Sequence, residues 1–230
     1  MTQERIAMVA LDIAGTTIDE GGAVYAALRN AVELHTGKAI PADQFDRWKG
    51  TGKRQAIAGL LGDVTVDEID AVESEFTRQL LDAYSSTPPA PLPGIADAFA
   101  ALRDHDVKIA LQTGYSRAIA GPLLEQVGWR VGRDIDAVIT SDQVRSSRPA
   151  PYLIFHAMET VGVQSVSEVL VAGDTPHDLR AGTNAGARYV AGVLTGAHDA
   201  ATLRPEPHTH ILTSAATIPE VLGLREQVTL

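Results

Sequence analysis

The chain has no cysteine among its 230 residues. This absence excludes disulfide bonds, thiolate metal sites and a cysteine nucleophile. The chain also lacks any apolar run near the roughly 20 residues that a membrane-spanning helix needs. Its opening stretch, MTQERIAMVALDIAGTT, does not have the pattern of a signal peptide. We therefore expect a cytoplasmic protein that makes no contact with a membrane.

Basic residues are scarce relative to acidic ones, with 19 Lys and Arg against 29 Asp and Glu and a formal net charge of -10. Nucleic acids bind clustered Lys and Arg, so we expect no nucleic-acid partner. A small anionic substrate is still compatible with this charge if a few basic side chains converge locally. The remaining composition, 45% hydrophobic and 21% charged, is that of an ordinary globular protein.

Short segments rich in Val, Ile and Leu recur along the chain, with helical patterns between several of them. They occupy residues 6–12, 107–114, 137–142, 169–174 and 188–194. Strands that are apolar on both faces and alternate with helices are typical of a parallel sheet covered on both sides. We predict an α/β protein with a doubly wound parallel sheet, in which ligands bind at the carboxyl ends of the strands.

The segment between the first two of these strands has helical periodicity and no strand pattern. Its longest helix is expected to follow an N-cap at Thr65. The stretch STPPAPLPG closes the segment and is typical of a return strap between domains. We predict an α/β core of residues 1–18 and 87–230, and an inserted all-helical cap of residues 19–86 above the strand ends.

Four polar signatures follow the predicted strands. The first, DIAGTT, places Asp12 at a strand end, where its carboxylate could attack phosphorus and form an aspartyl-phosphate. The alternative is a capping Asp that simply ends the strand. The second signature places Thr113 and Gly114 before a helix, where a hydroxyl and exposed N–H groups could bind an anion. A Thr-Gly pair also ends strands without any function.

The third signature is Arg148 before a proline, and the fourth is the pair Asp174 and Asp178. A guanidinium could clamp both a carboxylate and a phosphoryl oxygen, although an isolated Arg in a turn is commonly a surface residue. The two acids straddle a strand end and the first turn of a helix, where they could hold Mg²⁺. We also expect Asp174 to cap that helix, with Pro176 in its first turn.

All four signatures fall at strand ends, in an order that lets one parallel sheet gather them at one edge. This ordered set resembles the haloacid dehalogenase superfamily over nearly the whole chain, with the helical segment in the place of that family's cap. The resemblance implies that Asp12 is the nucleophile. It implies the following Mg²⁺ ligands: Asp12, Ala14, Asp174 and Asp178. It implies the following phosphate-binding residues: Thr113, Gly114 and Arg148.

Two positions depart from the usual phosphatase pattern of that superfamily. Ala14 stands where most members carry a second Asp, which protonates an alkoxide leaving group. Arg148 stands where Lys is usual. Both departures resemble the phosphonoacetaldehyde hydrolase (phosphonatase) subgroup, whose first motif runs Asp-x-Ala-Gly-Thr and whose third-motif base is Arg. The subgroup's resemblance also implies a homodimer formed through the cap.

That subgroup has a cap lysine that forms a Schiff base with the substrate aldehyde, and Lys53 stands in a similar setting. An imine requires a neutral amine, so we expect a lowered pKa for Lys53. We predict that the helix dipole and the nearby Lys49 and Arg54 lower it, with Thr51 capping a helix that begins at about Gly52. Lys49 stands where the subgroup has Met. This difference bears on the identity of the substrate more than on the type of reaction.

The sequence thus predicts a Mg²⁺-dependent hydrolase that cleaves the C–P bond of a 2-oxoalkylphosphonate such as phosphonoacetaldehyde. Its predicted catalytic residues are Asp12, Lys53 and Arg148. The alternative is a phosphomonoesterase or phosphomutase of the same superfamily in which Lys53 only binds the substrate; Ala14 argues against it. The acidic pair argues against a dehalogenase that attacks carbon without a metal ion. The intact motifs argue against a non-catalytic binding module.

Overall fold

The computed structural model describes residues 5–225, and the main element in this range is a six-stranded parallel sheet. The strand order is β5-β4-β1-β6-β7-β8, with every neighbouring pair parallel. The strands are β1 (Met8–Asp12), β4 (Lys108–Gln112), β5 (Ala137–Ile139), β6 (Val169–Gly173), β7 (Tyr189–Val193) and β8 (His210–Leu212). The predicted strands are confirmed. The edge strand β8 was not predicted, because Ile211 and Leu212 are its only apolar residues and polar residues flank them.

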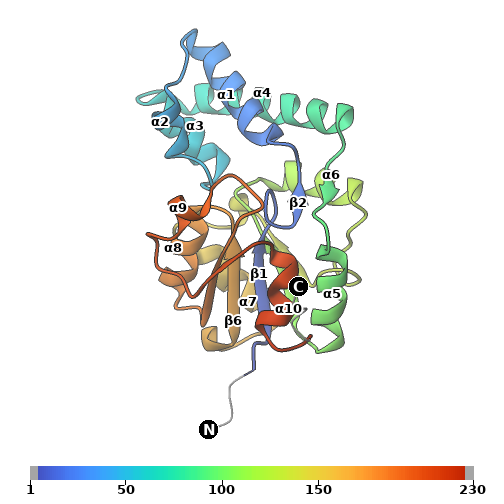
Figure 1. Cartoon of the computed structure of the whole chain (residues 1–230). Helices are drawn as coiled ribbons and strands as arrows, with labels where there is room; N and C mark the ends of the chain where they lie inside the picture. Colours follow the sequence, from blue (N-terminus) through green and yellow to red (C-terminus); the bar gives the residue numbers. More distant parts are fainter. Residues whose placement is uncertain (1–4, 226–230) are drawn as a thin grey trace.

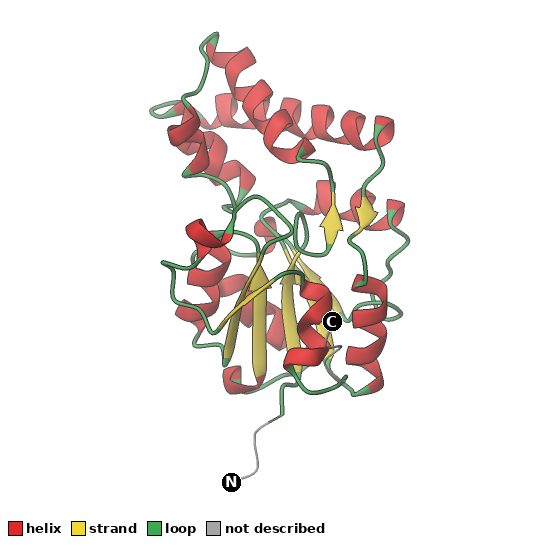
Figure 2. Ribbon diagram, in the orientation of Figure 1, coloured by secondary structure: helices red, strands yellow, loops and turns green. Residues whose placement is uncertain are grey.

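Helices cover both faces of the sheet (Figure 2). Successive side chains of a strand point to opposite faces, so Val9 joins one apolar cluster and Met8 the other. On the sheet, the first cluster is covered by α5 (Ile95–Asp104) and α6 (Arg117–Gln126), and the second by α7 (Tyr152–Val161) and α8 (Pro176–Ala185). The predicted doubly wound α/β fold is therefore confirmed. The short helix α9 (Ala200–Leu203) packs beside α8, and the short helix α10 (Ile218–Val221) packs beside α5.

A helical layer follows β1 in the chain and lies over the carboxyl ends of the sheet (Figure 1). Its helices are α1 (Ala23–Thr36), α2 (Ala42–Asp46), α3 (Lys53–Leu61) and α4 (Val66–Ser86). Val24 and Leu28 of α1 are buried in the same apolar cluster as Phe76 and Leu80 of α4. The helical insert is confirmed. Its description as a separate domain of residues 19–86, and a homodimer through it, stay predictions.

A short antiparallel ribbon marks where the chain leaves the sheet layer and returns to it (Figure 2). It pairs β2 (Ile18–Asp19) with β3 (Ala90–Pro91), which lies in the Pro-rich stretch predicted as a return strap. Residues 1–4 and 226–230, which the predicted core domain includes, lie outside the described residues. Across residues 5–225, no helix combines the length and apolar character needed to cross a membrane.

The helix starts confirm one predicted cap and correct two. Thr65 accepts the N–H of Glu68, and the Glu68 carboxylate accepts the N–H of Thr65, so the predicted cap of α4 is confirmed. Thr51 does not cap α3, because its hydroxyl donates to the Trp48 carbonyl. Asp174 does not cap α8 either. The next residue, Thr175, is the N-cap of α8, because its hydroxyl accepts the N–H of Asp178.

Candidate active site

The three central strands bring the predicted polar residues to one edge of the sheet. Strands β4, β1 and β6 are neighbours, so Thr113, Asp12 and Asp174 follow three adjacent strand ends. All three side chains are buried. The parallel sheet therefore assembles these signatures beneath the helical layer, as the sequence predicted.

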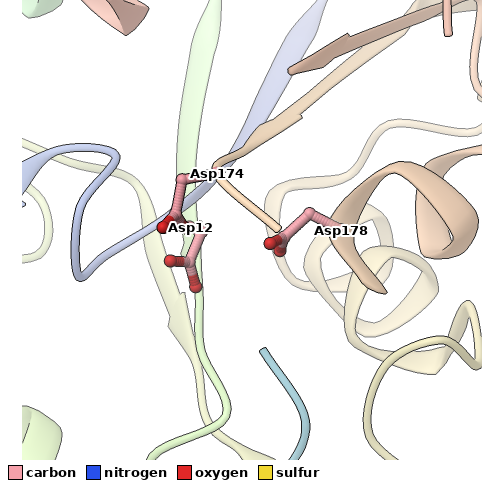
Figure 3. Close-up of side chains that lie close together, drawn as sticks. All are labelled: Asp12, Asp174 and Asp178. Carbon is pink, nitrogen blue, oxygen red and sulfur yellow. The ribbon is translucent and has the colours of Figure 1, made fainter. Parts of the chain in front are cut away.

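Three buried carboxylates meet at this edge (Figure 3). Asp12, Asp174 and Asp178 each offer an oxygen atom within 4.8 Å of the others. Burial, together with the negative charge of Asp12, raises the pKa of Asp174 to about 7. Carboxylate oxygens are the ligands that Mg²⁺ prefers, and a cation would offset the crowded negative charge. The donor set therefore fits a hard divalent cation.

Arg148 is a buried cation at the strand ends. Its Nη1 lies 2.8 Å from Asp12 Oδ1 and also contacts Asp178 Oδ1. The other oxygen of Asp178 accepts the N–H of Thr175 at 3.1 Å and the Thr175 hydroxyl. Both Asp178 oxygens are thus engaged, so this side chain holds Arg148 and the start of α8. The Nε of Arg148 is buried without a hydrogen-bond partner among the described residues, which makes it a free donor for a substrate oxygen.

The turn after Asp12 brings the backbone of Ala14 to the mouth of the site. Gly15 has φ +77°, and a Cβ there would lie 2.9 Å from Asp174 Oδ2, so the close approach requires glycine. The Thr17 hydroxyl donates to the Asp12 carbonyl at 3.1 Å. Ala14 itself lines a cleft of about 220 Å³ that opens between the sheet and the helical layer.

The loop before α3 docks directly onto the strand ends. The N–H of Lys53 donates to the Gly114 carbonyl at 3.0 Å. A Cβ on Gly114 would lie 2.4 Å from the Thr51 carbonyl oxygen, and a Cβ on Gly50 would lie 2.1 Å from Thr175 Oγ1. Both glycines are therefore needed where the two layers approach. In this structure Gly114 supplies a carbonyl and free space to the loop, and its role in binding a phosphate stays a prediction.

Lys53 is buried inside this junction. Its Nζ donates to the Thr51 carbonyl at 3.3 Å and lies 5.5 Å from the ring centres of Tyr25 and Tyr115. Burial, together with the positive charge of Arg148, lowers the pKa of Lys53 to about 8. The amine therefore has a substantial neutral fraction near neutral pH.

The direction of this pKa shift agrees with the prediction, but its main causes are burial and Arg148, not the nearby Lys49 and Arg54. Lys49 lies 2.8 Å from Asp46, and Arg54 forms ion pairs with Asp70 and Glu73. Carboxylates therefore neutralise both cations that were expected to act on Lys53. The sequence could not indicate burial, which depends on how the helical layer docks on the sheet.

Glu20 was not singled out from the sequence, yet it lines the same cleft as Ala14 and Asp174. Burial raises the pKa of Glu20 to about 7. Its Oε2 accepts the N–H of Val24 at 2.8 Å near the start of α1. An acid at a helix start is normally read as a cap, so no sequence signal separated Glu20 from other capping residues.

Comparisons with known proteins agree with this geometry. A family model described as haloacid dehalogenase-like hydrolase matches residues 6–186. Phosphonoacetaldehyde hydrolase from Parabacteroides distasonis is 29% identical over 216 residues, covering 85% of this chain and 79% of that protein. The protein of the same name from Bacillus cereus is 26% identical, covering 85% and 78%. The crystal structure of a phosphonoacetaldehyde hydrolase like protein from Oleispira antarctica matches the fold with a TM-score of 0.80 at 19% identity, covering 97% of this chain and 95% of that one.

Proposed function

The chain belongs to the haloacid dehalogenase-like hydrolase family, and from that premise we propose that it cleaves the C–P bond of a 2-oxoalkylphosphonate such as phosphonoacetaldehyde. The observation that carries the proposal is Lys53, a buried amine with a pKa of about 8 beside the Asp12 and Arg148 pair. Two relatives named for that activity match 85% of the chain.

Lys53 forms an imine with the carbonyl carbon of the substrate. The neutral amine attacks, water leaves, and the resulting iminium draws electrons away from the C–P bond. With a pKa of about 8, roughly a quarter of the Lys53 amines are neutral at pH 7.5, against roughly 0.1% for an ordinary lysine. The burial of this side chain therefore supplies the protonation state that the first step requires.

Asp12 then attacks phosphorus and forms an aspartyl-phosphate, while the carbon leaves as an enamine. Arg148 neutralises the phosphoryl oxygens through its unpartnered Nε, and the Thr113 hydroxyl binds beside it. Water hydrolyses the aspartyl-phosphate, and hydrolysis of the imine frees Lys53.

Mg²⁺ would be held by Asp12, the Ala14 carbonyl and Asp174, with Asp178 orienting the water shell of the ion and positioning Arg148. When bound, the ion neutralises negative charge on the phosphoryl group. The oxygen atoms that would hold the ion also keep the Asp12 carboxylate next to the phosphoryl group that it attacks.

Ala14 supports carbon as the leaving atom. A phosphatase that releases an alkoxide needs an acid near this position to protonate the leaving oxygen. An enamine leaves without a proton on oxygen, because the iminium nitrogen accepts the electron pair as the C–P bond breaks. Alanine at position 14 therefore does not slow this reaction, whereas it would slow the cleavage of a phosphate ester.

Borohydride trapping tests the proposal. The wild-type protein is incubated with phosphonoacetaldehyde and Mg²⁺, reduced with sodium borohydride and digested for mass spectrometry. We expect a reduced two-carbon adduct on the peptide that contains Lys53, and no adduct in K53R, which keeps a cation but cannot form an imine. Absence of the adduct together with brisk hydrolysis of p-nitrophenyl phosphate would instead establish a phosphomonoesterase in which Lys53 binds the substrate.

A further inference from the structure

Glu20 occupies the position between β2 and α1, on the wall of the cleft that Ala14 and Asp174 also line. Its Oε2 accepts two hydrogen bonds, from the N–H of Val24 at 2.8 Å and from the Tyr84 hydroxyl at 3.2 Å. These two bonds fix the carboxyl group while the side chain keeps access to the cleft. Glu20 is thus held from both α1 and α4.

Two tyrosines lie between Glu20 and Lys53. The hydroxyls of Tyr84 and Tyr115 lie 3.2 Å apart, and the Tyr115 ring flanks the Lys53 amine. Both tyrosines are at most 2% exposed, and burial raises the pKa of each phenol above its usual range. These hydroxyls therefore stay protonated and act as fixed donors. Glu20, whose pKa burial raises to about 7, can gain and lose a proton at neutral pH.

The proposed reaction needs an acid that the established motifs do not provide. Once the C–P bond breaks, the enamine must take a proton on carbon before the imine can be hydrolysed. At that stage Asp12 carries the phosphoryl group and Lys53 is part of the enamine. Arg148 does not release a proton in proteins, and Ala14 has no side-chain acid. Three carboxyl groups line the cleft, those of Asp19, Glu20 and Asp174. Asp19 is exposed and accepts the N–H of Gly21, and Asp174 belongs to the Mg²⁺ donor set, which leaves Glu20.

We propose that Glu20 is the general acid that protonates the enamine carbon, held in place by the Tyr84 hydroxyl. This inference rests on the proposed function. The Glu20 carboxyl gives its proton to carbon and becomes a carboxylate, and the enamine becomes an iminium. Water hydrolyses the iminium to the methyl-bearing aldehyde or ketone and the Lys53 ammonium. Hydrolysis of the aspartyl-phosphate releases the proton that restores Glu20, so the cycle consumes one water and no net proton.

The charged surroundings of Glu20 come from several elements. Lys53 of α3 favours the ionised carboxylate, and so does the hydrogen bond from Tyr84 of α4. Asp174, at the end of β6, disfavours the ionised form. Asp19, Tyr25 and Lys49 line the same cleft. Loss of solvent outweighs the other effects, so a proton remains available on Glu20 near neutral pH.

The variant E20Q tests this role, because a glutamine oxygen can still accept from Val24 and Tyr84 but the amide cannot act as an acid. Phosphate and acetaldehyde are measured separately in rapid-quench experiments with phosphonoacetaldehyde. In wild-type protein the two products should appear together. In E20Q we expect a burst of about one phosphate per active site at near wild-type rate, followed by acetaldehyde release that is about 100-fold slower.

Two further variants separate chemistry from structure. E68Q changes another acid that caps a backbone N–H in the helical layer, away from the cleft, and should keep the products together. Y84F removes the hydroxyl that positions Glu20, so it should keep the phosphate burst and slow acetaldehyde release several-fold. Equal slowing of phosphate and acetaldehyde in E20Q would overturn the role of Glu20 alone. Absence of a borohydride adduct at Lys53 in the wild type would overturn this role and the proposed function together.

Discussion

The burial of Lys53 has a free-energy cost whenever its amine is protonated. The side chain is 6% exposed, and its neighbours are two aromatic rings and Arg148 rather than a paired carboxylate. A shift from 10.5 to about 8 corresponds to roughly 3 kcal/mol that the folded state gives up below pH 8. A functional amine at this position is therefore maintained at the expense of stability.

This cost predicts a distinctive dependence of stability on pH. The pKa of Lys53 is lower in the folded than in the unfolded chain, so between pH 8 and pH 10.5 the unfolded chain binds more protons. The free energy of unfolding contributed by Lys53 is constant below pH 8 and rises with pH through that window. Urea unfolding of wild type and K53M at pH 7.5 and pH 10 measures it, since other titrating groups cancel in the difference. At pH 7.5 K53M should be the more stable protein, and its advantage should shrink at pH 10. An advantage that does not change with pH would contradict the burial of a charged amine.

Sequence patterns were informative for residues whose role follows from position along a strand. Asp12, Thr113 and Asp174 follow apolar runs, and parallel strands necessarily gather their carboxyl ends. Glu20 could not be found in this way, because its role depends on Tyr84, 64 residues further along the chain. The direction of the Lys53 shift was predicted from chemistry, but its cause is burial, which no local pattern encodes.

At the scale of elements, helix starts and short strands show where local patterns fail. The capping box at Thr65 contains all its partners within four residues, so the sequence predicts it. At α8 two candidates, Asp174 and Thr175, stand side by side. Asp174 does not cap α8, because its carboxylate accepts the N–H of Ala197, which belongs to a distant loop. Tertiary contacts of this kind decide between adjacent candidates.

The loop before α3 provides a prediction at this scale. Gly50 has φ +83°, and a Cβ there would collide with Thr175. Gly37, at the end of α1, has φ +65° with no atom within 4 Å of such a Cβ. G37A should therefore lose about 1 kcal/mol of stability from backbone strain and keep full activity. G50A should suffer the same strain and also displace the loop that carries Lys53, which lowers turnover of phosphonoacetaldehyde at least tenfold. Steady-state kinetics and thermal unfolding of both variants make the comparison. Full activity in G50A would show that the docked loop is not required.

At the scale of the whole molecule, the site exists only where the two layers meet. Lys53, Glu20 and Tyr84 come from the helical layer or its entry, whereas Asp12 and Arg148 come from the sheet layer. One apolar cluster runs through this junction and contains residues of β1, β4, α1 and α4. Apolar packing across the junction therefore holds the Lys53 amine near Asp12. A ligand bound at the strand ends stabilises both layers, because both contribute residues to the site.

Mg²⁺ should for this reason raise the temperature of unfolding of the entire chain. Asp12, Asp174 and Asp178 are buried together, and a cation that binds the folded state stabilises it by about 2.7 kcal/mol at 100 times its dissociation constant. For a chain of this length that corresponds to a rise of roughly 5 to 10 °C. The variant D174N removes one carboxylate from the crowded cluster, so it should respond little to the ion. Above pH 7, where Asp174 carries its charge, it should also unfold at a higher temperature than wild type without Mg²⁺. D63N, which changes an exposed acid on the helical layer, should respond as wild type does. Thermal unfolding with MgCl₂, at constant ionic strength set by NaCl, distinguishes these outcomes. An equal rise in D174N would show that the ion acts elsewhere on the acidic surface and not at the strand ends.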